Sequence, residues 1–399
     1  MPKTIQVINL PDALEALCRQ LTSHPFVAVD TEFMRQTTYR PKLCLIQVAA
    51  PGVEALIDPL SPGMDLAPFY DLMANRSVIK VFHAARQDVE IVYQEAGVIP
   101  EPLFDTQIAA MALGFGEAIS YNGLVSRLLR KEHDKSYQAV DWTARPMAQR
   151  QMEYALGDVT YLRDIYIKLK KKLAETGRES WLEEEVALLT DPKTYTFDPA
   201  DAWKRLRING KSQAARNAIK ALAAWREETA QRENVPRGRV IKDETIYEIA
   251  KFMPVSVEAL GRLRTSRDIP RGRWGEIVAA VKSAREAAGA DTDGDDKPVD
   301  APGQIPASAT ATIELFRVLL KAVAADLNIA SKLIASAEDL EKLAVSDAAD
   351  VRALEGWRRE AFGAKALALK QGHLALTVRG SKVVLIETDA LRAGSSTTG

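Results

Sequence analysis

Residues 26–50 read FVAVDTEFMRQTTYRPKLCLIQVAA, two apolar runs joined by the short polar segment RQTTYRP. Short runs rich in β-branched residues predict β-strands, and a short polar connection between them predicts a hairpin. The first strand carries Asp30 and Glu32 where further apolar residues would be expected. Because side chains alternate across a strand, both carboxylates share one face. Two like charges on that face need a cationic partner, since an unpaired buried charge strongly opposes folding.

The alternation of short strands and helices continues through the first 190 residues. Further strand-like runs cover residues 53–59 and 78–84, and helical patterns cover residues 85–97, 105–115 and 147–172. Hairpin connections near the start, followed by a strand that alternates with helices, predict an α/β domain with a mixed sheet.

The second half of the chain is predominantly helical in pattern. Amphipathic helical runs separated by prolines follow residue 200, and no strand series occurs before the final stretch 374–387. Residues 289–310 are acidic, rich in Pro and Gly, and nearly free of large apolar side chains, which predicts a linker. We therefore expect two small all-α modules, one on each side of this linker.

A weak internal repeat relates the two expected modules. Residues 234–251 align with residues 328–345, each with an apolar turn, an acidic segment and then a helix. In the second copy, Ser331 and Leu333 stand where the first copy has Arg237 and Arg239, so the second copy has lost basic surface.

The formal net charge of −1 conceals an asymmetry along the chain. Residues 1–190 carry 20 Lys and Arg against 25 Asp and Glu, a net charge of −5, whereas residues 200–288 carry 19 against 11, a net charge of +8. Residues 311–386 are close to neutral. An acidic unit beside a basic one indicates a charged ligand shared between them, with ordinary surface scatter as the alternative.

Several classes of protein are excluded by composition. Two cysteines, Cys18 and Cys44, in 399 residues do not supply a disulfide framework or a cluster of zinc ligands, and the four histidines show no paired metal-ligand spacing. The N-terminus lacks the pattern of a signal peptide, and no run of about 18 apolar residues could span a bilayer. We expect a soluble cytoplasmic protein whose cysteine thiols are reduced.

Further acidic residues follow other predicted strands and lie on predicted helices. Asp88 lies on the first turns of the helix after the strand at 78–84, and Asp105 ends another short apolar run, where it is either a metal-site residue or, as we favour, a helix N-cap. Tyr154 and Asp158 are four residues apart and share one helix face.

Divalent metal would balance these carboxylates, because Mg²⁺ prefers oxygen ligands and two such ions can stabilise both oxygens of an in-line phosphoryl displacement. Each carboxylate alone has an ordinary alternative, as a strand-end cap, a helix-surface acid or a solvated helical pair. In combination they form the ordered pattern D-T-E, H-x4-D and Y-x3-D, which chance rarely supplies.

This ordered pattern resembles a known family. VAVDTEF, FHAARQD and YALGDVTYL are similar to the three exonuclease motifs of the DEDD superfamily of 3′–5′ exonucleases, in its tyrosine subgroup. DTEFMRQTTYRPKLCLIQVA, DTQIAAM and DWTARPMAQRQMEYALGDVTYL resemble the ribonuclease D family in particular. The helical repeats resemble the helicase-and-RNase-D C-terminal (HRDC) domain, present twice.

The resemblance implies a domain organisation and an activity. It implies a ribonuclease H-like exonuclease domain at residues 1–195, a basic first HRDC domain at 200–288, the linker at 289–310, a second HRDC-like domain at 311–388 and a disordered tail at 389–399. The implied activity is metal-dependent release of mononucleotides from single-stranded RNA 3′ ends, in tRNA precursors and other small stable RNAs, by a monomer. The alternatives are a DNA exonuclease of the same superfamily and a non-catalytic RNA-binding protein.

The resemblance also implies residue roles around two Mg²⁺ or Mn²⁺ ions. Asp30 would bridge both ions, Glu32 and Asp158 would bind the ion that holds the attacking water, and Asp88 would serve the other ion, partly through water. Tyr154 would orient the attacking water, because its phenol is a weak base near neutral pH.

Other residues have two open interpretations. His83 either contacts the terminal nucleotide or is a core histidine, and Trp142 and Arg145 either border the substrate channel or pack structurally. The basic residues of the first helical module are expected to contact RNA phosphates without reading bases, among them Arg237, Arg239, Arg271 and Arg273.

Overall fold

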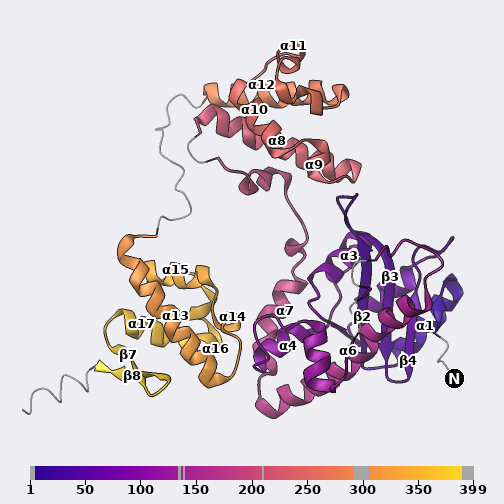
Figure 1. The fold of residues 1–399 in the computed structure, drawn as a ribbon, viewed down its shortest axis with the longest axis vertical. Coiled ribbons are helices and arrows are strands. Elements are labelled where there is room, and N and C mark those ends of the chain that lie inside the picture. Colours follow the sequence, from indigo (N-terminus) through magenta and orange to yellow (C-terminus); the bar gives the residue numbers. More distant parts are fainter. Residues whose placement is uncertain (1–4, 134–135, 138–139, 209–210, 291–304, 389–399) are drawn as a thin grey trace, which may run out of the picture.

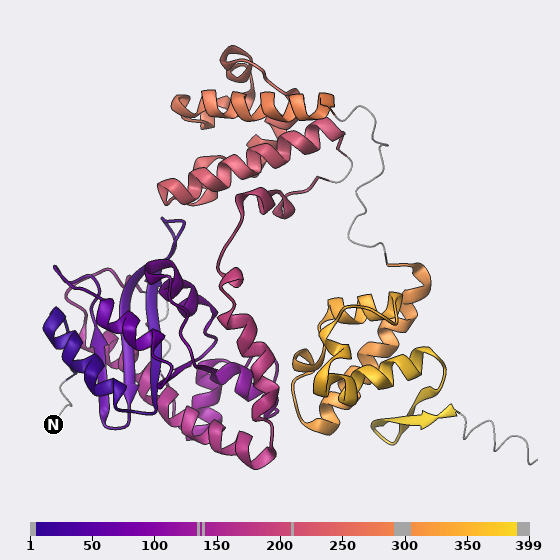
Figure 2. The ribbon, with the colours of Figure 1, turned by 180° about the vertical axis from the view of Figure 1, so that it is seen from behind.

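The computed structural model describes residues 5–133, 136–137, 140–208, 211–290 and 305–388. An α/β domain is followed by two mostly helical modules, as Figures 1 and 2 show from opposite sides. The mixed sheet and the helical region that were expected from the sequence are confirmed.

The α/β domain is built on a six-stranded mixed sheet in the order β1-β4-β3-β2-β5-β6. β2, β3 and β4 form the expected antiparallel hairpins, whereas β1 pairs with β4, β5 with β2 and β6 with β5 in parallel. The strands are β1 (Val7–Ile8), β2 (Phe26–Met34), β3 (Lys42–Ala50), β4 (Val53–Ile57), β5 (Ile79–Phe82) and β6 (Leu103–Asp105).

Helices cover both faces of this sheet. Val27 and Val29 of β2 pack in the core formed with α1, α2 and α3, while Ala28 packs on the opposite face against α6. Asp30 and Glu32 follow Ala28 at the two-residue spacing of a strand and so lie on the α6 face. The helices of the domain are α1 (Pro11–Thr22), α2 (Ala67–Ala74), α3 (Arg86–Ala96), α4 (Thr106–Ala112), α5 (Tyr121–Leu124), α6 (Gln149–Thr176) and α7 (Glu183–Thr190).

Each of the two helical modules contains a similar succession of α-helices. The helices of the first are α8 (Gln213–Glu233), α9 (Arg237–Val240), α10 (Asp243–Phe252), α11 (Val257–Gly261) and α12 (Trp274–Ala290). Those of the second are α13 (Ala307–Leu327), α14 (Ser331–Ile334), α15 (Ala337–Val345), α16 (Gly356–Arg358) and α17 (Ala364–Lys370). Short 3₁₀ and π segments connect several of these helices.

The weak sequence repeat corresponds to a structural one. From α8 to α13 the start moves from 213 to 307, from α9 to α14 it moves from 237 to 331, and from α10 to α15 it moves from 243 to 337, a constant step of 94 residues. The first long helix of each module ends at an asparagine in the left-handed conformation, Asn234 with φ 52° and Asn328 with φ 50°. Asparagine tolerates this conformation because its short side chain can bond locally.

The expectation of an all-α second module was wrong in one respect. Strands β7 (Leu374–Arg379) and β8 (Lys382–Glu387) form a two-stranded antiparallel sheet around Gly380, whose φ is 61°. The β-branched and apolar residues of the strand-like stretch 374–387 therefore pair with each other, and Leu376 and Leu385 pack on the module's core.

Some expected boundaries fall where the structure gives no description. Of the linker expected at 289–310, residues 291–304 lie outside the described residues, while α12 extends to Ala290 and α13 begins at Ala307. The tail expected at 389–399 also lies outside them. Among the described residues, no helix is long and apolar enough to cross a membrane.

Two contact areas join the modules to the α/β domain. At the first, the Tyr39 hydroxyl from the β2–β3 loop donates to the buried Glu227 of α8, which also pairs with Arg237. We call Tyr39, Glu227 and Arg237 the hairpin clasp. At the second, Trp181 stacks on Trp357 with ring centroids 4.3 Å apart.

Candidate active site

Strand β2 places the first two carboxylates. Asp30 and Glu32 are partly buried on the face of the sheet that α6 covers, and the register of β2 against β3 shifts at a bulge between Glu32 and Phe33. Bulges near sites re-aim side chains and increase local twist. Carboxylate oxygens of Asp30, Glu32 and Asp158 all lie within 4.8 Å of one another. Residues distant in sequence therefore form one acidic cluster.

The third carboxylate comes from the first turn of α3. Asp88 is 6% exposed, and its Oδ1 accepts a hydrogen bond of 2.6 Å from the Thr31 hydroxyl. Thr31 lies on β2 between Asp30 and Glu32, so this bond ties the start of α3 to the strand that carries the other two carboxylates.

Asp105 holds the turn that leads into α3. One of its carboxylate oxygens accepts hydrogen bonds from the backbone N–H groups of Ala84 and Gln107, and the other accepts one of 2.8 Å from Ala85. Ala84 has a positive φ of 57°, a conformation that costs an alanine free energy. Asp105 is the N-cap of α4, as we favoured, and it also stabilises this strained turn between His83 and Asp88.

Helix α6 supplies the fourth carboxylate and the tyrosine. Asp158 and Tyr154 are both buried and lie one turn apart. His133 approaches the same place, with its Nε2 2.8 Å from Asp158 Oδ1 and its ring stacked on Tyr154 at a centroid distance of 4.9 Å. A Cβ at Gly157 would lie 2.8 Å from His133 Cε1, so a larger residue at 157 would force this histidine to move.

Burial and mutual repulsion raise the pKa values of the cluster. Burial, followed by repulsion from Asp158 and Asp88, raises the pKa of Glu32 to about 9. Burial likewise raises the pKa of Asp88 to about 7, although the hydrogen bond from Thr31 acts in the opposite direction. The pKa of Asp30 lies well above its ordinary value because of burial and the three neighbouring carboxylates. Burial also raises the pKa of Asp158, against the opposing effect of His133 and Tyr154.

The carboxylates line a cavity of about 290 Å³ that suits a cation. No lysine or arginine is among its described lining residues, so no side chain there balances four carboxylates. The second oxygen of Asp158 is buried and accepts no hydrogen bond from the part of the chain that the structure describes. Clustered oxygen ligands of this kind fit hard divalent cations such as Mg²⁺.

His83 lies in the same cavity, whereas the arginines expected to bind RNA lie elsewhere. His83 Nδ1 is 3.0 Å from the Thr106 hydroxyl, and burial lowers the pKa of the imidazole. Arg237 belongs to the hairpin clasp, and Arg273 pairs with Glu233 at 2.6 Å.

Of the remaining candidate residues, two are exposed and two make contacts that hold the fold together. Arg239 and Arg271 of the first module are exposed. Arg145 makes two 2.8 Å bonds to the carboxylate of Asp58, and Trp142 is 2% exposed. For Trp142 and Arg145 the structural alternative therefore holds.

Sequence reasoning missed His133, Tyr121 and Gln87. Tyr121 and Gln87 line the acidic cavity, and the Tyr121 hydroxyl donates to the carbonyl groups of Gly157 and Asp158. One signal was available for His133. A glycine in the middle of a long helix costs about 1 kcal/mol relative to alanine, so Gly157 indicated a close approach to α6.

The comparisons with known proteins follow the division seen in the structure. Residues 5–174 match the model of a 3′–5′ exonuclease family, and residues 215–281 match the model of the HRDC domain. The exonuclease match covers the sheet and nearly all of α6, and therefore includes all four carboxylates and Tyr154.

Relatives are similar over nearly the whole chain. Ribonuclease D of Nitrobacter hamburgensis is 45% identical, over 96% of this chain and 100% of the relative. Ribonuclease D of a Jannaschia species is 46% identical, over 97% and 100% respectively. The crystal structure of Escherichia coli RNase D, described as an exoribonuclease involved in structured RNA processing, superposes with a TM-score of 0.77 at 28% identity, over 93% of this chain and 100% of that one.

Proposed function

The chain belongs to the ribonuclease D family and is a 3′–5′ exoribonuclease, and on that premise we propose that it matures the 3′ ends of tRNA precursors and other small stable RNAs. One observation carries the assignment of the site: four carboxylates converge in a cavity whose described lining holds no lysine or arginine. Family membership implies divalent metal, and we assign two ions, Mg²⁺ or Mn²⁺, to this cavity.

We assign the ion ligands as follows. Asp30 would serve both ions, an assignment supported by its position with Glu32 and Asp158 in the tight cluster and by its repulsion from Asp88. Glu32 and Asp158 would complete one site, and Asp88 would serve the other. The ions would supply a nucleophile at neutral pH and stabilise the charge that develops on the leaving oxygen.

The chain's own groups bind and orient the reactants. Tyr154 would hold the attacking water by a hydrogen bond, and His83 would contact the terminal nucleotide. Asp105 would keep His83 and Asp88 in place through the backbone turn that it stabilises. Phe33 and Leu162 would exclude bulk water from part of the cavity that they line. Orientation of this kind contributes to the rate because the reacting groups need not be ordered in the transition state.

The domain limits and the setting belong to the same proposal. We assign the chemistry to residues 1–195 and RNA binding to the HRDC domain at 200–288, and we assign the second repeat at 311–388 to the same domain type. We expect a monomer in the cytoplasm, where tRNA precursors are made, and the buried free thiols of Cys18 and Cys44 are compatible with a reducing compartment.

An assay on end-labelled RNA tests the proposal. With Mg²⁺ or Mn²⁺, a 5′-labelled tRNA precursor with a 3′ trailer should shorten progressively, faster than a DNA strand of the same trailer sequence. Asp30→Asn keeps the side-chain shape but removes the charge that would hold two cations, so it should reduce turnover by orders of magnitude while RNA binding persists. Discrete internal cuts, or normal turnover by Asp30→Asn, would contradict the assignment.

A further inference from the structure

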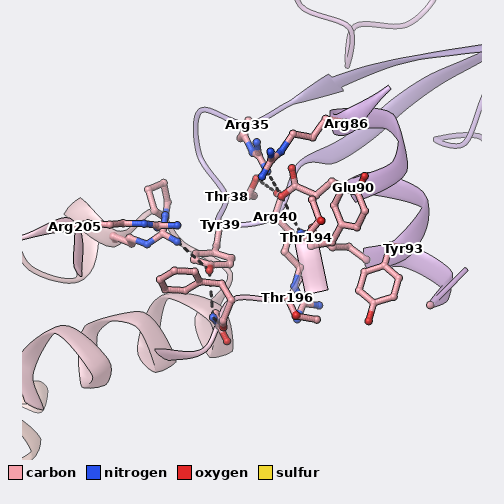
Figure 3. Close-up of a pocket in the computed structure, with 17 residues that line it drawn as sticks. Arg35, Thr38, Tyr39, Arg40, Arg86, Glu90, Tyr93, Thr194, Thr196 and Arg205 are labelled. Carbon is pink, nitrogen blue, oxygen red and sulfur yellow. Dashed lines mark hydrogen bonds and ion pairs between the residues drawn. The ribbon is translucent and has the colours of Figure 1, made fainter. Parts of the chain in front are cut away.

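A second cavity lies beside the active site. Its volume is about 1050 Å³, and its walls come from the β2–β3 loop, α3, the segment 194–197 and the first helical module. Figure 3 shows its side chains entering from two bodies, with Arg35 and Arg86 from the α/β domain and Arg205 from the side of the helical module. The hairpin clasp joins these bodies, so the cavity has a defined wall on each side.

The lining of this cavity is strongly basic. Among the described residues, five arginines line it against a single carboxylate, that of Glu90, which already pairs with Arg35. These arginines are Arg35, Arg40, Arg86, Arg205 and Arg237. Clefts lined by one sign of charge concentrate ligands of the opposite sign.

Three of these arginines, Arg40, Arg86 and Arg205, have no carboxylate partner among the described residues. Arg205 lies against the Phe197 ring, and Arg40 and Arg86 are exposed. The backbone N–H of Arg40 donates to Asn234 at 2.9 Å, which holds the start of its side chain against the helical module. Arginine presents several donors in a planar fork that matches phosphate oxygens.

Aromatic rings lie between the arginines. Tyr93 and Tyr195 pack with centroids 6.1 Å apart, and the Phe197 ring lies 4.0 Å from the Arg205 guanidinium. Alternation of guanidinium groups and aromatic faces is the arrangement that single-stranded nucleic acids find in grooves that bind without reading sequence. The lining therefore fits an RNA strand better than a compact anion.

Helix α3 connects the two cavities. Arg86, Glu90, Tyr93 and Gly97 recur at helical spacing and form the wall of the basic cavity. Gln87 and Asp88, in the same first turn, line the acidic cavity. The two linings include adjacent residues, 86 and 87, so the basic cavity begins within one helical turn of the acidic cluster, where the 3′ end of a bound strand would lie.

We propose that this arginine-lined cavity binds the backbone phosphates of the substrate RNA upstream of the scissile bond. The proposal rests on the exoribonuclease function and adds a subsite to it. The ligand is a single RNA strand of several nucleotides, held by charge and stacking without base reading. A dinucleotide has only the scissile phosphodiester and leaves none for this cavity, so the subsite should act on longer RNA alone.

The test uses the full chain and two matched double variants. Arg40→Gln with Arg86→Gln removes the two unpaired charges that the α/β domain contributes, without leaving a carboxylate unpaired, and keeps Arg205. Arg19→Gln with Arg76→Gln removes two exposed arginines of the same domain that line neither cavity. Affinity for a 5′-labelled 12-nucleotide RNA is measured in EDTA against salt concentration, and kcat/KM is measured with Mn²⁺ on that RNA and on a dinucleotide.

The cavity variant should flatten the salt dependence of RNA binding by about 1.4 in log–log slope, because each lost contact to single-stranded phosphate contributes about 0.7. The ratio of kcat/KM for the 12-nucleotide RNA to that for the dinucleotide should fall about tenfold, and the control variant should keep both wild-type values. An unchanged slope and ratio would overturn the proposal.

Two other results would also overturn the proposal. Equal losses on both substrates would place these arginines in the catalytic site itself. Binding of adenosine monophosphate as tight as that of the 12-nucleotide RNA, and equally weakened in the variant, would make the cavity a site for free nucleotides. Failure of the exoribonuclease function is distinguishable from all of these, because the wild-type protein would then shorten neither RNA.

Discussion

Asp30 shows how single residues in this site depend on divalent metal, which the family implies and the chain itself does not supply. Strand alternation predicted that Asp30 lies on a strand and shares one face of it with Glu32. The ordered pattern of motifs predicted Asp88, Tyr154 and Asp158. The contact of His133 with Asp158 could not be predicted, because it joins residues on an irregular segment and on α6 without any periodic pattern.

The raised pKa values predict that the metal-free protein loses stability as pH rises. Glu32 and Asp88 have ordinary pKa values of 4.5 and 3.8, which are raised to about 9 and about 7 in the folded protein. Between the ordinary pKa and the raised pKa of each group, the folded state holds a proton that the unfolded state has released. The free energy of unfolding therefore falls with increasing pH. The fall should continue through pH 7 for Asp88 and toward pH 9 for Glu32.

Denaturant unfolding between pH 5 and pH 9 in EDTA checks this prediction. The control is Asp30→Asn with Glu32→Gln, which should show a shallower fall over the same range. Saturating Mg²⁺ should remove most of the fall in the wild-type protein, because cations replace the protons. Identical pH profiles for the wild-type and variant proteins would contradict the prediction.

Replacement of Tyr154 by phenylalanine separates water orientation from metal binding. Tyr154→Phe removes only the phenolic oxygen, so the single-turnover rate on RNA should fall about tenfold, the effect of one hydrogen bond in the transition state. The Mn²⁺ concentration for half-maximal rate should stay unchanged. Tyr166→Phe is the matched control, because Tyr166 is a buried tyrosine of the same helix that packs on Phe26 and Phe104. Equal rates for Tyr154→Phe and the wild type would remove the tyrosine from the mechanism.

Among the elements, the turn between β5 and α3 depends most clearly on one side chain. Asp105→Ala should lower the free energy of unfolding by about 3 kcal/mol, because three buried or partly buried N–H groups lose their acceptor at once. Activity should also fall, since the turn places His83 and Asp88.

Asp198→Ala is the control for Asp105→Ala. The Asp198 side chain also caps a helical segment, but at the surface and through a hydrogen bond from the backbone N–H of Ala200, so its loss should lower stability by about 1 kcal/mol at most. Urea unfolding of both variants gives the comparison. Equal stability losses would show that Asp105 acts as an ordinary cap and does not hold the strained Ala84.

Local sequence patterns predicted the strands and helices better than they predicted the contacts between them. The strands β2 to β5, the long helix α6 and the repeated helices were predicted because each has a clear period and clear breaks. The hairpin clasp was not predictable, because Tyr39 and Glu227 are separated by 188 residues and no local pattern relates a loop tyrosine to a glutamate inside a helix.

At the scale of the whole molecule, the two helical modules meet the α/β domain in different ways. The first contributes arginines to the basic cavity. The second docks by the Trp181–Trp357 stack and by Arg358, which is fully buried, pairs with Glu184 and Glu185 and donates to the carbonyl of Leu333. A buried arginine with two carboxylate partners is costly to disrupt on one side only.

Truncation should separate these two contributions. A chain ending at Ala290 should keep the salt dependence of RNA binding to within one phosphate contact, about 0.7 in slope, because the segment it lacks carries a net charge of −3 and so contributes no excess of positive charge. A chain ending at Phe197 lacks Arg205 and Arg237 and should lose several contacts. RNA affinity measured in EDTA from low to high salt compares both with the full chain. If the shorter chain kept the full slope, the basic residues of the first module would have another use.

The constant step of 94 residues means that each position of the first module has a structural counterpart in the second, so the two can be compared residue by residue. At the places of Glu227 and Arg237 in the first copy, the second has Lys321 and Ser331, so both partners of an ion pair were replaced and neither was left alone. Apolar core positions instead stayed apolar and buried in both copies: Ile219 and Ile313, Leu222 and Phe316, Val240 and Ile334, Ile246 and Leu340, Ile249 and Leu343. One arrangement of helices with one set of apolar core positions thus carries two different surfaces, one that faces the β2–β3 hairpin and one that contacts α7.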